Sequence, residues 1–66
     1  MNKSTNVAAE IAAGIILDEW KRISNAAEKA RDAGLGELAD LQSETASILA
    51  RLFRELSGRY PHEARP

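Results

Sequence analysis

The sequence predicts an all-α protein built as an antiparallel helical hairpin. Two long stretches repeat apolar residues with the period of a helix, and a short glycine-containing segment separates them. No stretch alternates with the period of a strand. We expect one helix over about 6–33, a turn at 34–36, a second helix over about 37–57 and a loose tail at 58–66. A connector this short makes the two helices antiparallel neighbours within a single domain.

The first helix is predicted by its end signals and by a heptad pattern. Ser4, Thr5 and Asn6 are favourable N-cap residues. Gly34 suits the left-handed position that follows a helix, with Leu35 as the accompanying hydrophobic contact. Between these ends, apolar residues recur at alternating spacings of four and three: Ala9, Ala13, Ile16, Trp20, Ile23, Ala27 and Ala30. This spacing is typical of a helix that packs along one face against another helix.

The second helix begins with an acidic residue, Glu37, at the positive end of the helix dipole and stops at Ser57-Gly58, before Pro61. Its apolar side comprises Leu38, Leu41, Thr45, Ile48, Leu49, Leu52 and Leu56. We expect this side to face the first helix. The predicted pairs are Ala30 with Leu38 or Leu41, Ile23 with Ile48, and Ile16 with Leu56.

The hairpin is too small to bury all of its apolar residues. Twelve of its 29 hydrophobic residues are alanine, which contributes little buried area, and the absence of cysteine removes disulfides as a source of stability. The second helix is also shorter than the first, so that the apolar segment Val7–Leu17 extends beyond it. Within this segment Ala8, Ile11 and Ile15 form a second apolar stripe. A helix that is apolar on several faces is buried on several faces.

These features predict that two hairpins dimerise into a four-helix bundle, or that the hairpin docks on a partner protein. Alternatively, Tyr60 and Pro61 of the tail fold over the extending segment. Phe53 widens the apolar side of the second helix beyond the reach of one partner helix. The predicted partner-binding residues are Val7, Ala8, Ile11, Ile15, Leu17, Trp20, Leu49 and Phe53. The expected function is that of a non-enzymatic interaction module: an adaptor, a co-chaperone or an inhibitor-type regulator.

Composition argues against most other classes of protein. The longest apolar run without a charge is too short to span a bilayer, and the absence of cysteine fits a reducing compartment, so we expect a cytoplasmic protein. The single histidine, His62, lies in the tail and lacks the fixed surroundings that catalysis requires. No pattern of metal ligands or phosphate-binding loop is present. We therefore expect no enzymatic activity, no metal and no cofactor.

An RNA-binding regulator is the alternative function. The layout resembles that of Rop-type regulators, helical hairpins that dimerise and bind paired RNA loops, and the likeness covers size and helix–turn–helix plan. It is also similar to the layout of small type III secretion co-chaperones. In the RNA-binding alternative the contacting residues would be Lys21, Arg22, Lys29, Arg51 and Arg54. The net charge of −1 makes a nucleic-acid partner the weaker expectation, since phosphate binding favours a basic surplus.

Overall fold

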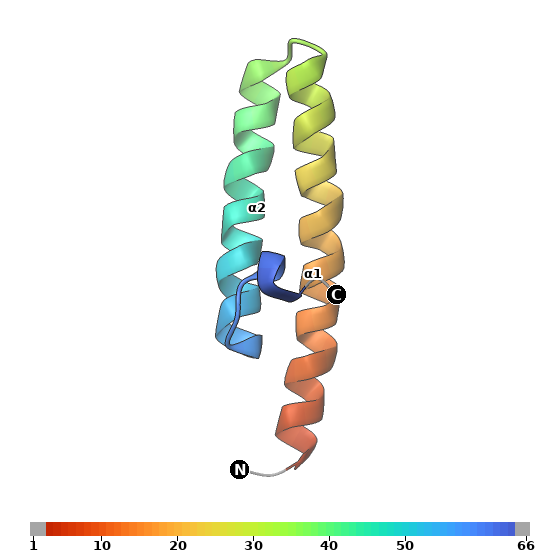
Figure 1. Ribbon diagram of the computed structural model, residues 1–66, viewed down its shortest axis with the longest axis vertical. Helices are drawn as coiled ribbons and strands as arrows, with labels where there is room; N and C mark the ends of the chain where they lie inside the picture. The colour runs from red at the N-terminus through yellow and green to blue at the C-terminus, as the bar shows by residue number, and fades with distance from the viewer. Residues whose placement is uncertain (1–2, 65–66) are drawn as a thin grey trace.

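The computed structural model describes residues 3–64, with side chains described for residues 7–63. The chain forms two packed helices, α1 (Lys3–Asp32) and α2 (Gly36–Ser57), followed by a short 3₁₀ helix, η1 (Pro61–Ala64). The two long helices run antiparallel, which confirms the predicted hairpin, and the part of the chain that the structure describes contains no strand. Figure 1 shows that α1 continues past the end of α2 at the pole opposite the turn.

The turn between the helices is fixed by backbone hydrogen bonds. Gly34 adopts a left-handed conformation with φ of 80°. The Leu35 N–H donates to the Ala30 carbonyl at 2.8 Å, and the Gly34 N–H donates to the Arg31 carbonyl at 3.1 Å. This pair of bonds satisfies the carbonyls at the end of α1 in the arrangement known as a Schellman motif. Arg31 also reaches across to α2, where its guanidinium lies 3.8 Å from a carboxylate oxygen of Asp40.

The start of α1 differs from the prediction. The helix begins at Lys3, so Ser4, Thr5 and Asn6 lie within its first turn instead of preceding it. Their side chains lie outside the described ones, and the predicted N-cap bonds are therefore not addressed by the structure.

Alanine makes up most of the contact layer between the two helices. On α1, Ala13, Ala27 and Ala30 are buried, and the larger residues of the predicted heptad are partly buried, so α1 faces α2 as predicted. On α2, the buried residues are Ala39, Ala46 and Phe53, one heptad apart. Small side chains allow the helix backbones to approach closely. Phe53 is the one large side chain among the buried residues of this layer.

The predicted inward side of α2 is wrong. Of its seven members only Leu49 is half-buried, and the structure exposes the other six: Leu38, Leu41, Thr45, Ile48, Leu52 and Leu56. The predicted pairing of Ile23 with Ile48 and of Ile16 with Leu56 therefore does not form the contact layer. The inward side lies one residue further along the chain, which rotates α2 by about 100° from the prediction. The position of α2 along the axis of α1 is close to the expected one, because Arg31 of α1 contacts Asp40 and Ser43 of α2.

The tail that we expected to be loose is folded over residues 58–63. Gly58 ends α2 in a left-handed conformation, and its N–H donates to the Arg54 carbonyl at 2.7 Å. Pro61 is buried, and the Tyr60 ring lies 5.3 Å beneath the Arg54 guanidinium. The Tyr60 N–H also donates to the Glu63 carboxylate at 2.7 Å. In Figure 1 the tail turns back from the end of α2 and crosses the hairpin.

Candidate interaction surface

A row of large aliphatic side chains on α2 is exposed to solvent. We call it the leucine face. Its members are Leu38, Leu41, Ile48, Leu52 and Leu56, which are 45, 63, 50, 42 and 39% exposed. Scattered apolar residues are normal on protein surfaces, but five along one side of a single helix form a continuous patch. Exposure of these apolar side chains to water is unfavourable in free energy, so burying them against another surface would favour association.

α2 carries two adjacent heptad rows. The inner row, Ala39, Gln42, Ala46, Leu49 and Phe53, is buried or half-buried toward α1. The second row, Leu38, Leu41, Thr45, Ile48 and Leu52, repeats the same 3-4-3-4 spacing one residue earlier and is exposed. The heptad spacing of the second row predicts a contact within the hairpin, whereas the structure leaves this row on the outer surface. The presence of two heptad rows on one helix is the sequence signal that indicates a second, outer contact surface.

The N-terminal part of α1, which includes the segment extending past α2, carries a separate exposed apolar stripe. Val7, Ile11 and Ile15 are 53, 62 and 66% exposed, and Ala8 is exposed beside them. On a helical projection these residues lie roughly opposite the side that contacts α2. They agree with the predicted partner-binding residues in being exposed, but they point away from α2.

The other four predicted partner-binding residues belong to the hairpin's own packing. Leu17, Trp20 and Leu49 are half-buried. Phe53 is 2% exposed and sits between the two helices, so it is a core residue of the hairpin. The eight predicted residues therefore do not form one surface.

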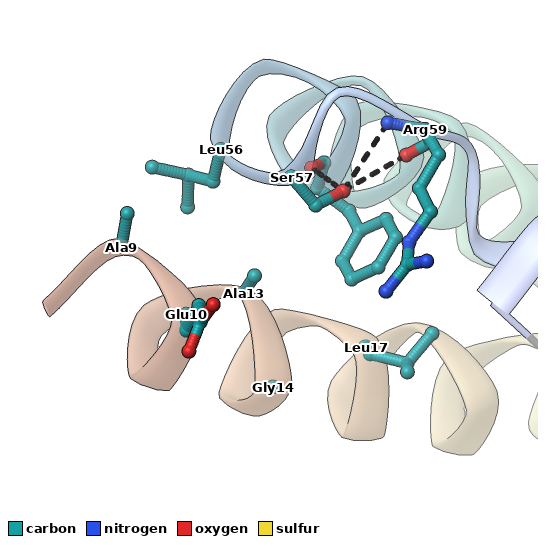
Figure 2. A pocket seen from close by; sticks show the side chains of 9 residues that line it. Ala9, Glu10, Ala13, Gly14, Leu17, Leu56, Ser57 and Arg59 are labelled. Carbon is teal, nitrogen blue, oxygen red and sulfur yellow. Dashed lines mark hydrogen bonds between the residues drawn. The ribbon is translucent and has the colours of Figure 1, made fainter. Parts of the chain in front are cut away.

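A groove of about 540 Å³ opens where α1 begins to extend past α2 (Figure 2). Its sides are formed by Ala13 and Leu17 of α1 and by Phe53 and Leu56 of α2. The Glu10 carboxylate and the Arg59 guanidinium lie along its border. Gly14 borders it too, and a Cβ atom added there would meet no heavy atom within 4 Å, so this glycine is not a point of close helix contact in the hairpin.

The polar groups of this groove have structural partners. The Ser57 hydroxyl lies 2.8 Å from the Phe53 carbonyl and 3.1 Å from the Arg59 carbonyl, and it accepts the Arg59 N–H at 3.3 Å. These contacts, drawn in Figure 2, hold the chain at the end of α2. The described residues contain no cluster of three or more His, Cys, Asp or Glu that could hold a metal ion. None of the described helices is long and apolar enough to cross a membrane.

The five candidate RNA-contacting residues are exposed but not gathered together. Lys21 and Arg22 are consecutive and so point about 100° apart. Lys29 lies one heptad from Arg22 on the same side of α1, while Arg51 and Arg54 lie on the other helix. Two of the five already have partners. Arg22 donates from Nε to the Glu19 carboxylate at 3.0 Å, and Arg54 stacks on Tyr60. The hydrogen bond from Arg22 holds the pKa of the Glu19 carboxyl below its usual value.

The chain matches no protein-family model, no curated protein and no solved structure. Its function is therefore inferred from the surface alone.

Proposed function

We propose that the chain is a non-enzymatic interaction module that acts by burying the leucine face of α2 against another helical surface. The observation that carries this proposal is that α2 turns mostly small side chains toward α1 and large aliphatic side chains toward solvent. Alanines fill most of the inner contact, while five large aliphatic side chains remain 39–63% exposed. Such a helix gains more from a second contact than from its first, because burial scales with apolar area. A four-helix bundle is the arrangement that this geometry supports best.

The apolar groove and the extending stripe support the proposal less directly. The stripe of Val7, Ile11 and Ile15 is as exposed as the leucine face but contains fewer large residues. The dispersed cations give the RNA-binding alternative no concentrated patch on which phosphates would be neutralised.

The experiment is affinity capture with the tagged full chain in its native host. We compare the wild type with Leu41→Asp on the leucine face, Ile11→Asp on the extending stripe and Leu35→Asp in the turn as matched control. Leu35 is 53% exposed, so its replacement changes charge to the same extent without touching the leucine face. We expect wild type, Ile11→Asp and Leu35→Asp to retain a bound protein, either an untagged copy or another chain, and Leu41→Asp to lose it.

Two results would contradict the proposal. The first is retention of the same protein by Leu41→Asp at the level of the control. The second is capture of nucleic acid alone, lost between low and moderate salt, which would instead support the RNA-binding alternative.

A further inference from the structure

We infer that the occupant of the leucine face is the leucine face of a second copy of this chain, with the two α2 helices antiparallel. This inference rests on the proposed function, since it names the partner of the same surface. It follows from four properties of the surface: its direction, its freedom from the tail, its size and the charges at its edge.

The direction of the leucine face is that required at the corner of a bundle. The inner row of α2 and the second row are offset by one residue, so their directions differ by about 100°. In a four-helix bundle each helix has two neighbours, in directions about 90° apart. The inner row contacts α1. The second row therefore points to the place of the next helix.

The tail leaves this place free. Arg54, which holds the Tyr60 ring, follows Leu52 by two residues and so lies roughly opposite the leucine face around the helix. The tail thus packs on one flank of the hairpin, and the leucine face occupies the other.

The side of the hairpin that carries the leucine face approaches the size of a stable dimer interface. Leu38 to Leu56 covers about 27 Å of helix, and the molecule is 22 Å across its middle dimension. Because the middle dimension spans both helices, the product of about 600 Å² is the flat area of the hairpin side that carries the leucine face, with α1 contributing the other half of its width. This area approaches the roughly 800 Å² per partner of a standard interface once the relief of the side chains is included. A second copy presents a face of the same length and composition.

An antiparallel arrangement pairs large residues and opposite charges. With the two-fold axis between Ala46 and Ser47, Leu41 lies opposite Leu52 of the second copy. Glu44 and Arg51 are exposed, one heptad apart, along the edge of the leucine face that is remote from α1. In the antiparallel order each Glu44 faces Arg51 of the other copy, which gives two ion pairs. In the parallel order the same charges would face the apolar positions Leu49 and Leu56.

The first test is sedimentation equilibrium of the purified full chain. We expect the wild type and Leu35→Asp to reach twice the 7.2 kDa mass of one chain, and Leu41→Asp to associate at least tenfold more weakly. A wild-type chain that stays at the mass of one chain up to the highest attainable concentration would overturn the inference. If that chain still captures a different protein through Leu41, the proposed function stands and only the choice of occupant fails.

The second test determines the relative orientation of the two α2 helices. Because the chain has no native cysteine, a spin label attaches only at the introduced one. Spin labels are attached to Glu37→Cys and, separately, to Ser47→Cys, and the distance between the two copies is measured by pulsed electron spin resonance. The antiparallel order separates the two labels at position 37 by about 28 Å along the axis and those at position 47 by about 2 Å. A distance at position 37 no longer than that at position 47 would show a parallel dimer and overturn the arrangement.

Discussion

Replacing Phe53 with alanine tests the rotation of α2 most directly. Phe53 is 2% exposed and lies against Ala13 and Leu17, so its removal leaves a cavity that small neighbours cannot fill. Phe→Ala substitutions at buried sites cost about 3–5 kcal/mol. A chain of 66 residues has a free energy of unfolding of roughly 3–10 kcal/mol. We therefore expect Phe53→Ala to remove a large part of the stability, or all of it, and Phe53→Leu to retain a folded chain.

The matched control is the neighbouring substitution Leu52→Ala. Leu52 is 42% exposed in the hairpin, so its truncation costs about 1–2 kcal/mol in dilute solution. The assay is urea denaturation followed by the fluorescence of Trp20, the single tryptophan, at several protein concentrations. We expect the cost of Leu52→Ala to rise with concentration as the leucine face becomes buried, and that of the Phe53 variants to stay constant. A larger cost for Leu52→Ala than for Phe53→Ala in dilute solution would refute the observed rotation of α2.

Three further outcomes are expected. Gly14→Ala raises the free energy of unfolding by about 1 kcal/mol in urea denaturation, because the helix gains propensity and the added Cβ meets no neighbour; a loss of stability would contradict this. Gln42→Leu stabilises the chain by about 1–2 kcal/mol in the same assay, because the buried Gln42 Oε1 has no hydrogen-bond partner among the described residues, and an unchanged midpoint would count against it. The Glu19 carboxyl titrates below its usual pKa by NMR and returns to it in Arg22→Gln, so the stabilisation from this pair is present above the usual carboxyl pKa and is lost as pH falls through the lowered one; identical titration curves would refute the pairing.

The hairpin and α1 could be predicted from the sequence because their signals do not compete. Gly34 is followed by Leu35, and the two supply the Schellman bonds found in the structure. The heptad from Ala9 to Ala30 has no rival row of comparable regularity on α1, so its inward side was identified correctly.

The rotation of α2 could not be predicted because two heptads compete on one helix. Hydrophobicity favours the row that contains Leu41 and Leu52, and a prediction based on burial selects it for the hairpin. The structure instead uses the row of Ala39 and Ala46, whose small side chains match the alanines of α1 and allow close packing. The choice depends on the fit between two helices, which is absent from the pattern of either helix alone. The folded tail was missed because its contacts, such as Arg54 on Tyr60, arise from side-chain stacking.

The position of the largest core residue has a consequence for the order in which the chain folds. Arg31 and Asp40 meet across the turn nine positions apart, whereas the buried residues Ala13 and Phe53 are 40 positions apart. The entropy lost in closing a loop grows with its length, so contacts form first at the turn and last at the Phe53 end. Local opening follows the reverse order, and amide hydrogen exchange should slow progressively from the groove toward the turn. The folded tail, with Pro61 buried, adds contacts to α2 at the end that closes last, where they slow its opening most.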